Sequence, residues 1–251
     1  MKNYQKFEGK AVIYDQHRPS YPHEYLAYLI EANSLLENSK IADIGSGTGI
    51  LTKQLLDCGG TVIGVEPNAQ MRAIAEENLK GYPKFISLNQ TAEQTGIESE
   101  SLDLVTVAQA FHWFDTAMFK IECQRILKPL ANVALVWNSR DLSSQIVIEN
   151  AEICKQFCPN FKGFSGGIEE TPEVYKEFFK NGKYDYQEFK NDLLFDLEGF
   201  LGRNLSASYA PKSHEVNYAL FVEALTEQFH RYANHGKIVF PNITKSYMGQ
   251  V

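Results

Sequence analysis

The sequence predicts an α/β fold in which a mostly parallel sheet carries helices on both faces. Three observations lead to this prediction. Apolar segments of strand length alternate with amphipathic segments of helix length through the first half of the chain, a pattern typical of parallel strands joined by crossover helices. Uninterrupted apolar segments such as VALVW suit strands that are buried on both faces. A glycine-rich turn, DIGSGTG, links the first of these strands to a helix.

Each expected element of the first half has its own signal. An amphipathic helix is expected over 22–36, and the apolar segments predict strands at 40–44, 61–66, 84–89, 102–108 and 132–138. Helices between the strands show apolar stripes at helical spacing, formed by Met71, Ile74, Ala75 and Leu79 and by Phe119, Cys123, Ile126 and Leu127. Glycine at 59–60 ends the first crossover helix, and Pro129 follows the last one.

The second half of the chain predicts a mainly helical cap. Helices are expected within 141–182, a sixth strand within 184–195, a long helix over 214–234 and a last strand within 237–249. Pro241 would confine this last strand to an edge or a bulge. We therefore expect an N-terminal arm and helix over 1–35, a ligand-binding core over 36–140, and a cap over 141–251 in the same globular unit.

Composition narrows the function classes. The 251 residues carry a net charge of -7, which argues against a broad surface for nucleic acid or anionic membrane. No apolar run approaches the ~20 residues of a membrane span, and the N-terminus lacks the apolar core of a signal peptide. The four cysteines show neither disulfide nor zinc spacing. We therefore expect a cytoplasmic protein with no metal, nucleic-acid or membrane partner.

The glycine pattern points to an adenosine ligand. Gly45, Gly47 and Gly49 form G-x-G-x-G at a strand-to-helix turn, where open α/β sheets bind their ligands. The dinucleotide fingerprint G-x-G-x-x-G fails by one place, because position 50 is isoleucine. Glu66 ends the second strand, and its carboxylate can accept hydrogen bonds from both hydroxyls of a ribose. Asp43, just before the glycines, favours a ligand other than NAD.

Four segments in order resemble the class I S-adenosylmethionine-dependent methyltransferases: IADIGSGTGILTKQL, VIGVEPNAQM, NQTAEQTGIESESLDLVTVAQAFHWFD and RILKPLANVALVWN. The likeness covers roughly residues 10–140. AFHWFD and YDQHRPSYP are similar to the small-molecule branch that includes trans-aconitate-type methyltransferases. The resemblance implies a Rossmann-like, seven-stranded sheet whose last strand is antiparallel. It also implies S-adenosyl-L-methionine as cofactor and a small-molecule methyl acceptor, at oxygen or alternatively at nitrogen or carbon. The protein is expected to be a monomer or a weak homodimer.

The resemblance also implies cofactor-binding roles. The glycine loop would approach the methionine part of the cofactor, with Asp43 beneath it holding the loop or reaching the amino group. Glu66 would bind the ribose, and Arg18 would pair with the methionyl carboxylate. Many relatives carry aspartate where this chain has Thr91, near the adenine amine. The full set of implied cofactor residues is Tyr14, Arg18, Asp43, Gly45, Ser46, Gly47, Glu66, Pro67, Met71, Thr91, Ala92, Glu93 and Gln109.

The acceptor side is expected in QAFHWFD, after the fourth strand. His112 would act as a general base toward a hydroxyl or amine, or it would orient a carboxylate acceptor and shape the pocket. Further substrate candidates are Trp113, Trp137, Arg203, Ser208 and Tyr209. Two alternatives stay open: a non-catalytic protein that binds S-adenosylmethionine or S-adenosylhomocysteine, and an NAD-dependent oxidoreductase.

Overall fold

The computed structural model describes residues 19–164, 172–207 and 209–251, so Tyr14, Arg18 and Ser208 lie outside the described residues. The chain forms two compact units. The first contains Met1–Trp137, Thr171–Phe189 and Thr244–Val251, and the second contains Asn138–Glu170 and Lys190–Ile243. This division differs from the expected one, which placed all of 141–251 in a cap within a single unit. Segments 171–189 and 244–251 belong with the first unit because they contribute a helix and two strands to it.

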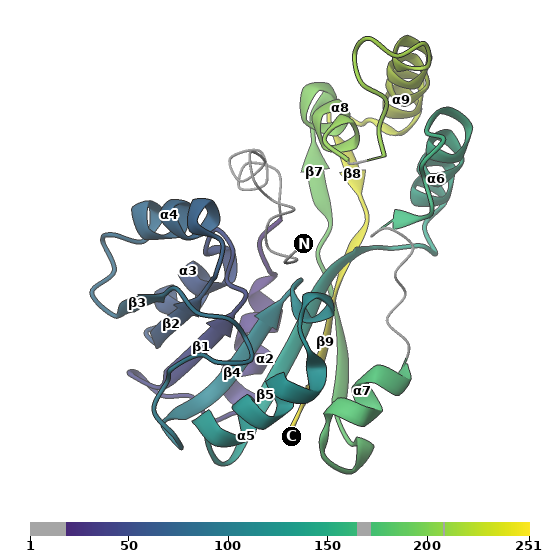
Figure 1. Ribbon diagram of the computed structural model, residues 1–251. Coiled ribbons are helices and arrows are strands. Elements are labelled where there is room, and N and C mark those ends of the chain that lie inside the picture. Colours follow the sequence, from purple (N-terminus) through teal and green to yellow (C-terminus); the bar gives the residue numbers. More distant parts are fainter. Residues whose placement is uncertain (1–18, 165–171, 208) are drawn as a thin grey trace. The chain divides into compact units, whose positions relative to one another are not determined.

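A seven-stranded sheet forms the centre of the first unit (Figure 1). Its strands are β1 (Lys40–Ile44), β2 (Thr61–Val65), β3 (Phe85–Leu88), β4 (Leu102–Ala108), β5 (Leu127–Arg140), β6 (Asp185–Lys190) and β9 (Asn242–Gly249). They lie in the order β3-β2-β1-β4-β5-β9-β6. The first five pair in parallel, and the last strand is antiparallel, as expected. Strand order changes direction at β1, so the turn after β1 lies where such sheets bind ligands.

Helices cover both faces of this sheet. These are α2 (His23–Ala32), α3 (Ile50–Asp57), α4 (Ala69–Asn78), α5 (Thr116–Ile126) and α7 (Pro172–Phe178), with short 3-10 turns at η2 (Phe111–Trp113) and η4 (Lys180–Gly182). Successive residues of β4 alternate between two cores: Val105 packs with α5 and α7, and Leu104 packs with α2 and α3. Because neighbouring strand residues face opposite sides, these two cores lie on opposite faces of the sheet. The predicted fold class is confirmed.

The sixth strand expected within 184–195 is present as β6, but the late strands differ from the expectation in two ways. The segment 184–195 forms two strands: β6 joins the large sheet, and β7 (Leu193–Phe195) pairs with β8 (Ile238–Phe240) in a separate antiparallel ladder. Pro241 does not confine the last strand to an edge, since β9 lies between β5 and β6. Pro241 stands between β8 and β9, where its missing N–H is not needed, and its carbonyl accepts a hydrogen bond from the N–H of Asp141 at 3.1 Å.

The second unit combines α6 (Gln145–Phe157), α8 (Leu197–Leu205) and α9 (Tyr218–Tyr232) with the β7–β8 ladder. Asp196 begins α8 by accepting a hydrogen bond from the N–H of Gly199 at 2.8 Å. Aromatic and aliphatic side chains from all three helices and from β8 form its core, among them Val147, Phe200, Phe221, Leu225, Phe229 and Phe240. This unit therefore has a hydrophobic core of its own.

Candidate functional site

The glycine turn between β1 and α3 is held against the end of β2. The N–H groups of Gly45 and Ser46 both donate to the carbonyl of Val65, at 2.8 and 3.2 Å. Gly45 has φ +70°, and a Cβ at this position would lie 2.6 Å from the Cβ of Ala110. Gly47 also has a positive φ, of +57°. Glycine is thus required at 45 both by the backbone conformation and by the close approach of the segment after β4.

Asp43 connects three elements beneath this turn. Its side chain is fully buried. One carboxylate oxygen accepts from the hydroxyl of Thr52 in α3 at 2.6 Å, and the other accepts from the hydroxyl of Thr106 in β4 at 3.1 Å. Burial raises the pKa of Asp43 to about 6, although both hydroxyls oppose the shift. The sequence analysis missed Thr52 and Thr106, because nothing in their spacing from Asp43 marks them as its partners.

Glu66 follows β2 and faces the same turn. One of its carboxylate oxygens accepts from the N–H of Gly47 at 2.9 Å, and the other accepts from the N–H of Asn68 at 2.7 Å. Burial raises the pKa of Glu66, while these backbone hydrogen bonds lower it. A carboxylate oxygen has two lone pairs, so each oxygen can accept a further hydrogen bond. Glu66 can therefore hold the turn and bind a ligand diol at the same time.

Asn68, which the sequence analysis missed, sets the position of the next helix. Its carboxamide oxygen accepts from the N–H groups of Gln70 and Met71, at 3.0 and 3.1 Å. Asparagine immediately before an amphipathic stripe is a usual N-cap signal, which could have identified it. The cap places Met71, which is buried, so that its Sδ lies 3.6 Å from where a Cβ on Gly47 would stand. Pro67 lies between Glu66 and this cap and is half-buried.

The segment between β3 and β4, residues 89–101 and here called the β3–β4 loop, contains the expected adenine contacts. Thr91 is exposed, Ala92 is buried, and Glu93 is half-buried. The carboxylate of Glu93 accepts from the N–H of Asp115 at 3.0 Å, at the beginning of α5. The loop is thereby joined to the helix that follows the QAFHWFD segment.

The QAFHWFD segment begins at the carboxyl end of β4. Gln109 has φ +59°, a sparsely populated conformation for a residue with a side chain, and its N–H donates to the carbonyl of Val136 at 3.0 Å. Ala110 and Phe114 are the residues that a Cβ on Gly45 would meet. His112 is exposed, and its ring centroid lies 4.5 Å from that of Trp113.

The remaining substrate candidates divide between the two units. Trp137 packs its ring against Phe111, Tyr175 and Tyr247 in the first unit. Arg203 lies on α8 in the second unit, and Tyr209 belongs to the same unit. Burial raises the pKa of the Tyr209 hydroxyl to about 12. The described residues from Asp43 to Gln109 that were expected at the cofactor all belong to the first unit, where Gly47 contacts both Glu66 and Met71.

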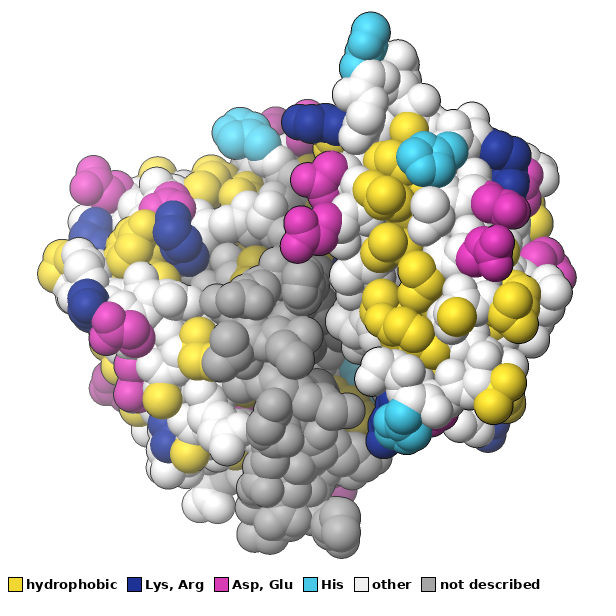
Figure 2. All heavy atoms as spheres, turned by 90° about the horizontal axis from the view of Figure 1, so that it is seen from above, with side chains coloured by type: hydrophobic (Ala, Val, Ile, Leu, Met, Phe, Trp, Pro, Cys, Tyr) yellow, Lys and Arg dark blue, Asp and Glu magenta, His cyan; other side chains and the backbone are white. Residues whose placement is uncertain are grey.

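The surface shows no dominant charge on the side displayed in Figure 2. There, the Lys and Arg side chains of the described residues stand singly among Asp and Glu side chains. Within the described ranges, no group of three His, Cys, Asp or Glu side chains is placed to hold a metal ion. None of the helices in the described part of the chain is long and apolar enough to cross a membrane.

Comparison with known families identifies the core of the first unit. Residues 42–135 match the family described as "Methyltransferase domain". An uncharacterized methyltransferase of Mycobacterium tuberculosis is 38% identical over 146 residues, and the match covers 58% of this chain and 57% of that relative. An uncharacterized methyltransferase of Schizosaccharomyces pombe is 27% identical over 97% of this chain and 96% of its own.

Solved structures share the fold. The phosphoethanolamine N-methyltransferase 2 of Haemonchus contortus, solved with phosphomonomethylethanolamine and S-adenosylhomocysteine, has a TM-score of 0.58 and 16% identity. This likeness covers all of the present chain and 60% of that one. The YcgJ protein of Bacillus subtilis has a TM-score of 0.54 and 17% identity, over 92% of this chain and 100% of its own. A specific likeness to trans-aconitate-type methyltransferases is not among these findings.

Proposed function

We propose that this chain, whose residues 42–135 match the methyltransferase domain family, transfers a methyl group from S-adenosylmethionine to a small-molecule acceptor, at oxygen. One observation carries the proposal. The Glu66 carboxylate accepts from the Gly47 N–H while Gly45 lies against Ala110, so the acid proposed to bind the ribose, the glycine turn and the segment after β4 are in contact with one another.

The residues present fit this cofactor. A Cβ on Gly47 would stand in ordinary van der Waals contact with the Met71 Sδ, at 3.6 Å, so Met71 lies directly against the glycine turn. The buried hydroxyl of Thr48 has no hydrogen-bond partner among the described residues. A buried hydroxyl usually finds a partner, and a polar group of a bound ligand would provide one. Gly47, Thr48 and Glu66 would then contact the amino-acid and ribose parts of the cofactor.

When bound, S-adenosylmethionine supplies a methyl group on a positively charged sulfur, which is already primed to leave. The protein's task is then to orient the acceptor in line with that methyl group and to exclude water. Ala92 would offer its N–H to the adenine ring, and Thr91 or Glu93 would lie near the adenine amine. Gln109 would line the sulfonium end.

His112 is the candidate for proton transfer at the acceptor. It is exposed beside Trp113, in the segment whose Ala110 and Phe114 lie against Gly45. For a hydroxyl or amine acceptor, the imidazole would remove the proton as the nucleophile attacks, since its usual pKa lies near 6.5. A carboxylate acceptor needs no base, and His112 would then orient it. Trp113 and Trp137, with Arg203, Ser208 and Tyr209, remain the proposed substrate residues.

Two further points belong to the proposal. All four cysteines are free thiols, three of them buried, which suits a cytoplasmic location. The acidic chain and its interspersed charges favour a small-molecule acceptor over nucleic acid. We expect a monomer or weak homodimer.

An acceptor screen tests the activity. The protein is incubated with S-adenosylmethionine labelled in its methyl group and with panels of small carboxylates, phenols and amines. The amines are included because the Haemonchus contortus enzyme was solved with an amine-bearing ligand. Methyl transfer to a carboxylate or phenol supports the proposal, and transfer to an amine moves the acceptor to nitrogen. Cofactor binding without transfer to any panel member favours the non-catalytic alternative.

A further inference from the structure

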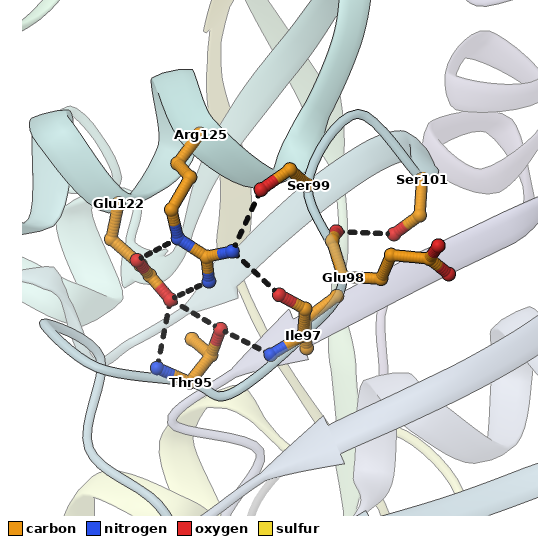
Figure 3. A network of polar contacts seen from close by, with 7 residues as sticks. All are labelled: Thr95, Ile97, Glu98, Ser99, Ser101, Glu122 and Arg125. Carbon is orange, nitrogen blue, oxygen red and sulfur yellow. Dashed lines mark hydrogen bonds and ion pairs between the residues drawn. The ribbon is translucent and has the colours of Figure 1, made fainter.

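An ion pair on α5, between the buried Glu122 and the exposed Arg125, holds the β3–β4 loop (Figure 3). Glu122 and Arg125 form a two-pronged contact, with Arg125 Nε and Nη2 donating to the two Glu122 carboxylate oxygens at 2.8 and 2.7 Å. Glu122 Oε1 also accepts from the N–H and the hydroxyl of Thr95, at 2.8 and 2.5 Å. Arg125 Nη1 donates to the carbonyl of Ile97 at 2.7 Å and to the hydroxyl of Ser99 at 3.2 Å. The two side chains therefore contact the loop at every second residue, at Thr95, Ile97 and Ser99.

The loop depends on these side chains for its conformation. The N–H of Ile97 donates to the hydroxyl of Thr95 at 3.2 Å, not to a backbone carbonyl. The N–H of Glu100 donates to the carbonyl of Arg125 at 2.9 Å. Thr95 and Ile97 are buried within this otherwise mostly exposed loop, and buried backbone groups must find partners. Here α5 provides them, so the loop takes its position from the helix.

The Glu122 carboxylate is buried and remains ionised, whereas Arg125 is exposed. Glu122 is 7% exposed. Burial opposes its ionisation, yet hydrogen bonds from Arg125 and Thr95 lower the pKa of Glu122 to about 2. An ion pair with one exposed partner usually contributes little to stability, so stability alone is a weak reason for this one. What the pair provides is a fixed geometry, because a guanidinium and a carboxylate meet in one plane.

The same helix fixes the other end of the loop. Glu93 accepts from the N–H of Asp115 at the beginning of α5, and Glu122 and Arg125 lie in its last two turns. Glu93 is therefore itself attached to the beginning of this helix, and Ala92 directly precedes it; the contacts of Thr95 with Glu122 begin two residues after Glu93. That helix begins directly after the QAFHWFD segment.

We propose that Glu122 and Arg125 are positioning residues that set Ala92 and Glu93 for recognition of the adenine base of the cofactor. The inference rests on the proposed function. Neither side chain contacts the cofactor; both act through the loop. Through the loop they hold the Ala92 N–H opposite the accepting ring nitrogen of adenine. They likewise hold an oxygen of Thr91 or Glu93 opposite the donating amine of adenine.

Two ligands separate this role from general support of the fold. S-adenosylhomocysteine carries adenine, whereas S-inosylhomocysteine carries hypoxanthine, which presents an N–H and a carbonyl in place of the accepting nitrogen and the amine. Affinities for both are measured by isothermal titration for the wild type, Glu122→Gln and Thr95→Val. The matched control is Glu152→Gln, which weakens the exposed Glu152–Lys155 pair of the same spacing in α6. Thr95→Val leaves Glu122 and Arg125 in place and tests the loop contact even if Glu122→Gln does not fold.

The account predicts that both loop variants bind S-adenosylhomocysteine about tenfold more weakly, while their affinity for S-inosylhomocysteine changes by at most about twofold. The ratio of the affinity for S-adenosylhomocysteine to that for S-inosylhomocysteine should therefore fall in both loop variants. In the control variant this ratio should stay at the wild-type value. Equal weakening of both ligands, or an unchanged preference, would overturn the positioning role. A wild type that fails to bind S-adenosylhomocysteine would instead refute the proposed function, and the inference with it.

Discussion

The Oε2 atom of Glu66 lies 2.9 Å from the backbone nitrogen of Gly47, so the residue directly after β2 fixes the turn that follows β1. This contact joins two adjacent parallel strands at their carboxyl ends. The turn cannot shift without displacing the Glu66 carboxylate, and this carboxylate cannot rotate without losing its hydrogen bond from the Gly47 N–H. A ligand that bound both would find them at a set separation, which lowers the entropy cost of binding.

Replacing Glu66 should reduce affinity for the cofactor. Glu66→Ala removes a charge-assisted acceptor for the ribose hydroxyls, and we expect S-adenosylhomocysteine to bind at least about tenfold more weakly, a loss of ~1.4 kcal/mol. Isothermal titration measures this, with Glu77→Ala as the control, because Glu77 is an exposed residue in an i,i+3 pair with Lys80 on α4. Equal affinities for the wild type and Glu66→Ala would remove Glu66 from the site.

Asp43 should make the fold less stable as pH rises from about 4 to about 6. Its pKa is raised in the folded state from 3.8 to about 6, so in this range the folded protein binds more protons than the unfolded chain. Asp43→Asn lacks this titration. The free energy of unfolding of the wild type, relative to the variant, should therefore fall by roughly 3 kcal/mol across this window and stay constant above it. Denaturant titrations at several pH values measure the difference in unfolding free energy between the wild type and Asp43→Asn. A difference that did not depend on pH would contradict a buried Asp43 carboxyl with a raised pKa.

Gly45→Ala should destabilise the protein by more than the strain of a left-handed backbone. The added Cβ would lie 2.6 Å from Ala110, and the residue has φ +70°. Gly96→Ala is a matched control: its φ is +71°, and no atom lies within 4 Å of its added Cβ. We expect a loss of about 1–2 kcal/mol for Gly96→Ala and a clearly larger loss for Gly45→Ala. If thermal unfolding gave equal losses, the turn and the segment after β4 would not be in contact.

His112→Ala should separate catalysis from cofactor binding. His112 is exposed and stands outside the contact between Gly45 and Ala110. With a hydroxyl acceptor, kcat should fall about a hundredfold or more, and the affinity for S-adenosylhomocysteine should stay nearly unchanged. His214→Ala, at an exposed position of the second unit, should change neither quantity. Loss of cofactor binding in His112→Ala would place this residue in the cofactor pocket or in the support of the fold.

The sequence predicted the parallel half of the sheet well because its signals are local. Apolar runs, glycine at the turn after β1 and helical stripes each depend on neighbouring residues. The predicted strand at 40–44 coincides with β1, and that at 102–108 coincides with β4. Met71 and Phe119 on the predicted stripes are buried. In the site, likewise, the glycine turn and Glu66 were identified from short-range patterns.

What the sequence did not predict depends on contacts between distant residues. The insertion of β9 between β5 and β6 places the end of the chain inside the sheet, and no local pattern around Pro241 indicates this. The division of 184–195 into β6 and β7 follows from pairing with two different partners, β9 and β8. Thr106 forms a hydrogen bond with Asp43, 63 positions away in the sequence, and Glu122 forms one with Thr95, 27 positions away. Side chains of these types are common, and the fold alone makes them partners.

The most direct test of the central claim is isothermal titration of the full chain with S-adenosylhomocysteine, with NAD as the control ligand. The account predicts micromolar binding of S-adenosylhomocysteine with one site per chain, and no binding of NAD. Binding of NAD, or of neither ligand, would contradict it, because the turn from Gly45 to Gly49 and the carboxylate of Glu66 would then serve another ligand.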